Sequence, residues 1–154
     1  DAPQSAKRAA GPQIMKTFGG WDVRCFNAST PAPCDVWEAI AFKKGGNLAV
    51  SVSVVYVPSQ NRHLMQFIVP LGVDIAKGAK LTAGSYSSDT MQYHHCDRVG
   101  CYFGVGDGNA LVDAMKGQTT LKVRVAQFRG KSVDLAVPLK GSNDAHGAMV
   151  ELAK

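Results

Sequence analysis

The 154-residue chain has the length of a single domain, and with 45% hydrophobic and 19% charged residues it is too apolar and too weakly charged for a disordered protein. No apolar run reaches the roughly 18 residues that a membrane-spanning helix needs. The longest run, residues 48–57, is interrupted by Ser51 and Ser53, and the net charge of +5 comes mostly from isolated basic residues, so we expect neither a transmembrane segment nor a nucleic-acid partner.

The start of the chain differs in composition from the rest. Residues 1–12 are polar, rich in alanine and proline, and without a hydrophobic period, so we interpret them as a disordered lead-in. The first residue is an aspartate, which fits a chain from which a signal peptide has been removed. Residues 13–154 are then expected to form one domain.

The first half of this domain is expected to consist of strands. Hydrophobic residues alternate or are densely β-branched between turn residues in four segments: residues 21–26, 35–42, 48–57 and 62–69. In the first segment Trp21, Val23 and Cys25 share one face, which predicts a half-buried strand. The last segment ends at Pro70, because proline cannot donate a hydrogen bond to a strand ladder.

The second half continues with shorter strands and two helices. Strands are expected over residues 81–85, 90–95, 101–105, 119–128 and 131–139. Asp107 can cap a short helix, and Gly117 suits the position just past its end. A second helix is expected over residues 143–154. Their predicted buried faces contain Leu111, Val112 and Met115 in the first helix, and Met149, Val150 and Leu152 in the second. Turn signals about every 8–12 residues predict an all-β fold, an antiparallel β-sandwich of about 8–9 strands with one or two short helices.

The four cysteines allow three disulfide pairings. Cys25 and Cys34 flank a proline-containing turn, and Cys96 and Cys101 flank a shorter turn. Paired positions in a hairpin bring Cα atoms to the roughly 5.5–6 Å that a disulfide needs. We therefore predict the bonds Cys25–Cys34 and Cys96–Cys101, which persist outside the cytosol.

A zinc site is the alternative for part of this cysteine set. His94, His95, Cys96 and Cys101 are all residue types that bind zinc. Neighbouring residues of a strand face opposite sides, however, so the two histidines would not both reach one metal ion. We expect disulfides, no bound metal, and histidines that lie on the surface or in a turn.

No motif in the sequence indicates catalysis. Ser85, Ser87 and Ser88 lack the glycine pattern of a nucleophile elbow, and oxidised cysteines cannot act as nucleophiles. The glycine-rich residues 104–108 lie among predicted hairpins and not in a βαβ unit, so they do not predict a dinucleotide site. We expect no catalytic residue and no cofactor.

Glu38 stands out because it shares a predicted buried face with Val36, Ile40 and Phe42. A carboxyl group in such a place needs hydrogen-bond partners or stays protonated. It can contact a ligand, or it can bond to a backbone amide or to the indole of Trp21. We favour the structural role.

Four short motifs together resemble one protein family. They are GWDVRC at residues 20–25 followed by Cys34, VPLGV at residues 69–73, the pair Cys96 and Cys101, and VPLKG at residues 137–141. In order and spacing these resemble the invasion-associated locus B family. The resemblance implies an exported, all-β protein of Gram-negative bacteria, periplasmic, secreted or associated with the outer membrane, linked to host-cell entry and virulence, with no catalytic motif. It departs from the family at the polar residues 142–147.

Two kinds of binding function follow as expectations. The first is a non-enzymatic binding or accessory factor whose partner is a protein or a cell-envelope component, with peripheral membrane association included. The second is a periplasmic lipid- or glycan-binding β-sandwich, which predicts an apolar cavity of several hundred Å³ between the sheets. An unrecognised hydrolase would instead require a serine within hydrogen-bonding distance of a histidine.

Overall fold

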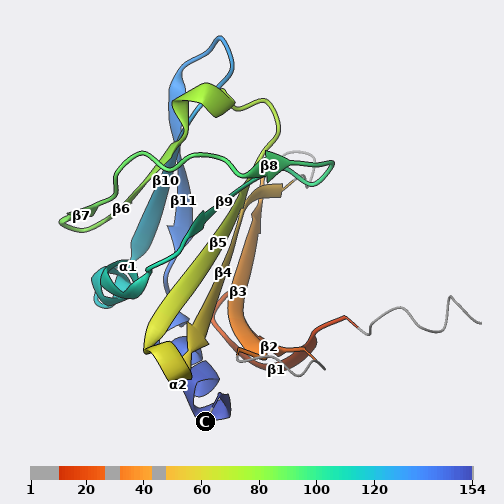
Figure 1. The fold of residues 1–154 in the computed structure, drawn as a ribbon, viewed down its shortest axis with the longest axis vertical. Coiled ribbons are helices and arrows are strands. Elements are labelled where there is room, and N and C mark those ends of the chain that lie inside the picture. The colour runs from red at the N-terminus through yellow and green to blue at the C-terminus, as the bar shows by residue number, and fades with distance from the viewer. Residues whose placement is uncertain (1–10, 27–31, 43–47, 154) are drawn as a thin grey trace, which may run out of the picture.

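In a computed structural model, the protein is a sandwich of two antiparallel sheets with two α-helices at one end (Figure 1). The structure describes residues 11–26, 32–42 and 48–153. Most of the expected lead-in, residues 1–10, lies outside the described residues. Among the described residues no helix is long and apolar enough to cross a membrane.

The larger sheet has seven strands in the order β1-β2-β3-β4-β5-β9-β8. They are β1 (Gln13–Phe18), β2 (Trp21–Cys25), β3 (Cys34–Ala41), β4 (Leu48–Val57), β5 (Arg62–Val69), β8 (His95–Cys96) and β9 (Cys101–Val105). The predicted bounds of β4, β5 and β9 are confirmed, because hydrophobic alternation and flanking turn residues agree there.

The smaller sheet has four strands in the order β11-β10-β6-β7. They are β6 (Ala79–Ala83), β7 (Tyr86–Ser87), β10 (Thr120–Ala126) and β11 (Ser132–Pro138). The helices are α1 (Asn109–Met115) and α2 (Ser142–Leu152), with single 3-10 turns at η2 (Pro58–Gln60) and η3 (Ile75–Lys77).

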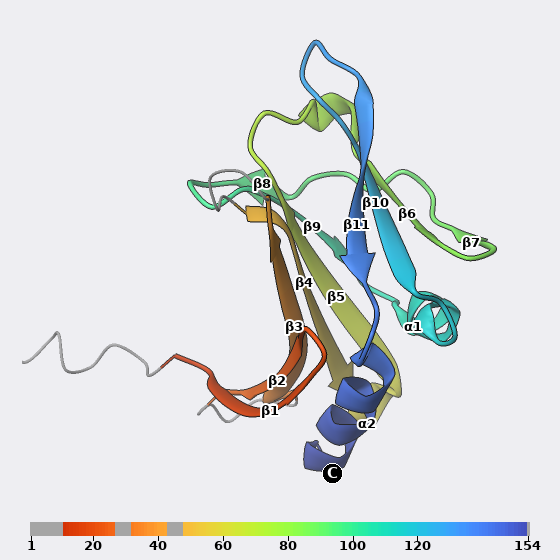
Figure 2. The same ribbon diagram turned by 180° about the vertical axis from the view of Figure 1, so that it is seen from behind.

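The core fills the space between the sheets. Trp21, Phe67 and Phe103 are its largest aromatic members, and the rings of the two phenylalanines stack with centroids 4.9 Å apart. Helix α2 packs against β1, β2 and β3, and α1 packs against β5 and β6. Both helices lie at the same end of the sandwich, while the turn between β10 and β11 and the 3-10 turn η3 lie at the other (Figure 2).

The first hairpin and the segment before α2 meet at two glycines. Gly19 and Gly141 both have positive φ values, 60° and 87°. A Cβ atom on Gly19 would collide with the carbonyl of Lys140, and one on Gly141 would collide with the carbonyl of Phe18. Only glycine allows these two backbones to approach so closely.

Several sequence predictions need correction. Strand β1 was not predicted, because nearly all its residues are exposed and give no hydrophobic alternation. The strand expected over residues 90–95 is reduced to β8, because Met91 pairs with Ala79 of the smaller sheet before the chain crosses to the larger one. The N-cap of α1 is Gly108 and not Asp107. In α2 Met149 is buried as predicted, but Leu152 is 44% exposed because it lies in the last turn, beyond the packed face.

Candidate functional site

The space between the two sheets is closed at the helical end and open at the opposite end. Along the inner face of β3 and the residue that follows it, the exposed fraction rises from 2% at Val36 to 44% at Phe42. Along the inner face of β11, Val137 is fully buried, whereas Leu135 and Val133 are only partly buried. The interior of the sandwich therefore opens to the surface between β3 and β11.

At this opening lies a hollow of about 660 Å³. Its apolar lining includes Phe42, Leu71, Val73, Phe128, Val133 and Leu135. A second hollow of about 600 Å³ shares Phe42, Pro70 and Leu71 with the first and extends to Leu48, Arg98 and Val99. The two hollows together are called the apolar groove below. Each falls within the roughly 300–1,000 Å³ of small-molecule sites.

Backbone bonds fix the shape of the groove. Pro70 ends β5, and Gly72 then turns the chain with a φ of 95°. The N–H of Phe128 donates to the carbonyl of Gly72 at 2.8 Å, and the N–H of Asp74 donates to that of Ala126 at 2.7 Å. The segment after β5 is thereby joined to the end of β10, so the groove has a wall that is already formed without a ligand.

The turn that carries Arg98 is also held rigidly. The Cys96–Cys101 disulfide closes it, and Asp97 Oδ1 accepts from the N–H of Val99 at 2.8 Å. Asp97 Oδ2 accepts from the hydroxyl of Tyr102 at 2.9 Å. The backbone hydrogen bond from Val99, with the other bonds, lowers the pKa of Asp97, so its carboxylate is ionised and already occupied.

The charge near the groove is unevenly balanced. Asp134, a carboxylate of the lining, pairs with Arg124 at 3.5 Å. Arg98 is exposed, and no carboxylate among the described residues forms a salt bridge with it. At the other end Arg129 lies over the ring of Phe128, 5.3 Å from its centroid. The groove therefore has apolar walls and an unpaired positive charge at one end.

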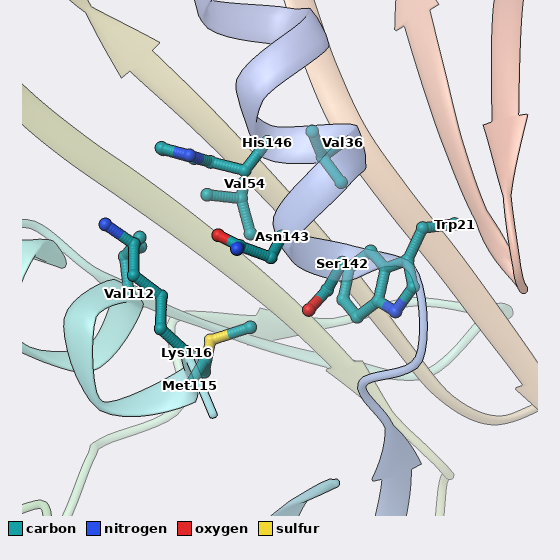
Figure 3. A pocket seen from close by; sticks show the side chains of 9 residues that line it. All are labelled: Trp21, Val36, Val54, Val112, Met115, Lys116, Ser142, Asn143 and His146. Carbon is teal, nitrogen blue, oxygen red and sulfur yellow. The ribbon is translucent and has the colours of Figure 1, made fainter. Parts of the chain in front are cut away.

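A second place, the seam between α1 and α2, is too small for a ligand. Its lining includes Trp21, Met115, Lys116, Asn143 and His146, which face one another in Figure 3. The space that they leave is about 20 Å³. That is room for about one water molecule.

Beside this seam His63 and His146 form a hydrogen-bonded pair, with their Nε2 atoms 2.7 Å apart. Asn109 fixes the proton positions: its Nδ2 donates to the carbonyl of Asn61, so its Oδ1 accepts from His63 Nδ1. When each ring carries one proton, His63 Nε2 then accepts from His146 Nε2–H. Desolvation, followed by the charge of His63, lowers the pKa of His146 to about 4.

The arrangement required by the hydrolase alternative is not found in the described part of the chain. No serine hydroxyl there forms a hydrogen bond with a histidine. Ser88 Oγ instead accepts from the N–H of Leu81 and donates to the carbonyl of Asp89. The His63–His146 pair instead connects β5 with α2.

Of the two structural partners expected for Glu38, a backbone amide and the indole of Trp21, the indole bonds elsewhere. The indole N–H of Trp21 donates to the carbonyl of Pro138 at 3.0 Å, and the buried Oε2 of Glu38 has no hydrogen-bond partner among the described residues. The side chain is 4% exposed, and burial raises the pKa of Glu38 to about 7. Phe42, predicted on the same buried face, lies in the groove at 44% exposure.

Both predicted disulfides are present. Cys25 joins Cys34 and Cys96 joins Cys101, each with Cα atoms 4.0 Å apart. His94 and His95 are exposed as predicted, but their Nδ1 atoms lie 2.7 Å apart, because His94 precedes β8 and does not follow strand alternation. No group of three or more metal-binding side chains occurs among the described residues.

Comparison with known proteins agrees with the motifs. The sequence model of the family described as "Invasion associated locus B (IalB) protein" matches residues 21–150. The crystal structure of invasion associated protein b from Bartonella henselae matches with a TM-score of 0.77 at 19% identity, over 91% of this chain and 98% of that chain. No curated protein matches the sequence. At 19% identity the structural match shows the shared fold, and the family match extends over most of the chain, so this protein belongs to the invasion associated locus B family.

Proposed function

We propose that this chain is an exported, non-enzymatic binding protein of the bacterial envelope, and that the apolar groove receives the hydrocarbon part of a lipid-like envelope component. The observation that carries the proposal is the loss of cover along β3 and β11, which leaves Phe42 44% exposed. Contiguous apolar surface of this kind marks the binding sites of folded domains.

The lining of the groove favours a lipid over a glycan. A glycan needs several convergent hydrogen-bonding side chains. Of the described residues that line the larger hollow, only Gln127 and Asp134 have polar side chains, and Asp134 is paired with Arg124. Phe42, Leu71 and Leu135 offer only hydrophobic contact. Hydrocarbon is the ligand chemistry that such walls bind best.

Export and the absence of catalysis are supported by the cysteines. Both disulfides close hairpins, and such bonds persist in the periplasm and outside the cell. They also leave no free thiol nucleophile in the chain. If this family member contributes to host-cell entry, we propose that it does so as an accessory factor that binds an envelope component.

The test is to load the oxidised protein with lipids extracted from Gram-negative envelopes, re-purify it, and identify bound lipid by mass spectrometry. Leu71, which lines both hollows and is 55% exposed, is changed to glutamate to place a charge in the groove. Ile75→Glu is the matched control, because Ile75 is 58% exposed and lines neither hollow.

We expect lipid on the wild-type protein and on Ile75→Glu, and at least tenfold less on Leu71→Glu. The two variants carry the same change of charge and remove side chains of similar exposure, so they separate the groove from general surface hydrophobicity. Absence of lipid from all three proteins, or equal amounts on all three, would show that the groove is not a lipid site.

A further inference from the structure

The uneven charge of the apolar groove identifies the polar end of its ligand. Asp134 is compensated by Arg124, whereas Arg98 lines the smaller hollow with no salt-bridge partner among the described residues. Asp97, its neighbour, is occupied by the N–H of Val99 and the hydroxyl of Tyr102. The guanidinium is thus available to an anion at one end of the apolar groove, whose lining is mostly hydrophobic.

We infer that the groove binds a long-chain carboxylate, with its carboxylate group at Arg98 and its alkyl chain running past Leu71 toward Leu135. This inference rests on the proposed lipid-binding function and adds the class of ligand and its direction. Leu71, Pro70 and Phe42 belong to both hollows, so one chain passing them occupies a continuous apolar path.

A carboxylate fits this end better than a phosphate monoester. Among the described residues Arg98 is the one cationic side chain that lines the two hollows, and it can form paired hydrogen bonds with a carboxylate. A fatty acid carries one negative charge at neutral pH, whereas a phosphate monoester carries about −1.5 to −2. One guanidinium therefore neutralises the carboxylate and leaves the phosphate undercompensated.

The backbone of the turn that carries Arg98 is fixed before the ligand arrives. The Cys96–Cys101 bond and the hydrogen bonds of Asp97 hold the turn, and Gly100 lies so close to Val69 that a Cβ atom would collide with the carbonyl of Val69. The turn is thereby pressed against the end of β5. A backbone that is already held loses less conformational entropy when a side chain on it binds an anion.

Calorimetric titration of the full, oxidised chain tests the inference with decanoate, dodecanoate, tetradecanoate, 1-dodecanol and dodecyl phosphate, each below its micellar concentration. Each added methylene should tighten binding by about three- to fourfold if it is buried in the groove. Arg98→Gln should weaken dodecanoate by about fivefold and leave 1-dodecanol unchanged, because only the carboxylate contacts the guanidinium.

Lys122→Gln is the matched control for charge. Lys122 is exposed on β10 and lines neither hollow, so its loss changes the net charge as Arg98→Gln does without touching the groove. It should bind dodecanoate as the wild type does. If Lys122→Gln weakens dodecanoate as much as Arg98→Gln, the attraction comes from overall charge and the assignment of Arg98 is wrong.

The remaining outcomes separate this inference from the proposed function. If Arg98→Gln binds dodecanoate and 1-dodecanol as the wild type does, the headgroup assignment is wrong although the groove still binds chains. If dodecyl phosphate binds more than tenfold tighter than dodecanoate, the carboxylate class is wrong. If no probe binds while envelope lipids remain on the wild-type protein but not on Leu71→Glu, the single-chain class is wrong and the lipid-binding function stands.

Discussion

Both ends of the sandwich contain hydrophobic side chains, but these are buried at one end and exposed at the other. At the helical end α2 buries Ala145 and Met149 against the larger sheet, and Trp21 is fully covered. At the opposite end Phe42, Leu71 and Phe128 are 44%, 55% and 63% exposed. Hydrophobic residues thus stabilise the fold at one end and remain available for contact at the other, so stability and binding should respond to different substitutions.

The largest expected effect tests this division directly. Trp21→Ala removes a fully buried indole and its hydrogen bond to Pro138, and should lower the free energy of unfolding by about 3–5 kcal/mol. Phe128→Ala at the open end should change it by less than about 0.5 kcal/mol. Urea denaturation followed by circular dichroism measures both. Similar losses from the two variants would mean that the open end also belongs to the stabilising core.

The next largest change in the free energy of unfolding is expected from removing the disulfides. Replacing Cys25 and Cys34 by alanine releases a bond that spans a sequence separation of 9, and should cost about 2–3 kcal/mol of stability. Replacing Cys96 and Cys101, with a separation of 5, should cost about 2 kcal/mol and also weaken dodecanoate binding, since the turn of Arg98 loosens. Denaturation and titration of both variants check this. Equal affinity of the two variants for dodecanoate would show that the turn closed by Cys96–Cys101 does not affect binding in the groove.

The raised pKa of Glu38 predicts that the protein loses stability as the pH rises. Because burial raises the pKa of Glu38 from 4.5 to about 7, the folded state holds its proton after the unfolded state has released it, and stability falls between pH 4.5 and 7. Glu38→Gln should therefore gain about 1–2 kcal/mol at pH 8 and nothing at pH 4. Unfolding free energies across this range test the sign. A gain that is equal at both pH values would contradict it.

The lowered pKa of His146 predicts a smaller change of stability with pH, of the opposite sign. Its pKa falls from 6.5 to about 4, so the unfolded state binds a proton more readily, and stability is lost as the pH falls from 6.5 toward 4. On the Glu38→Gln background the loss should be about 1 kcal/mol, and His146→Gln should reduce the slope. The exposed His94 provides the control variant, His94→Gln, which should retain the slope of the background. Hydrogen exchange in α2 would show whether the loss is local.

The sequence predicts the strands that have one buried face and clear turns, and it fails where burial depends on distant segments. The bounds of β4, β5 and β9 are predicted without error. The strand β1 escapes prediction because its side chains are exposed. Phe42 continues the apolar face of β3, and nothing local indicates that the smaller sheet leaves it uncovered.

The candidate site is predictable only in its parts. The motif VPLGV marks residues 69–73, and the sequence predicts the disulfide at Cys96 and Cys101, yet neither shows that Leu71 and Arg98 line one hollow. That proximity arises because Gly100 packs against the end of β5. Glu38 illustrates the same limit: its buried face is predicted, but the sequence does not show that the indole of Trp21 donates to Pro138 instead.

The close approach of Gly19 and Gly141 has a consequence for the order of assembly. It joins the first hairpin to the segment that leads into the last helix, so the first strands and the last helix pack against each other. A chain that lacks α2 leaves the helical end of the sandwich uncovered, even when the middle strands have formed.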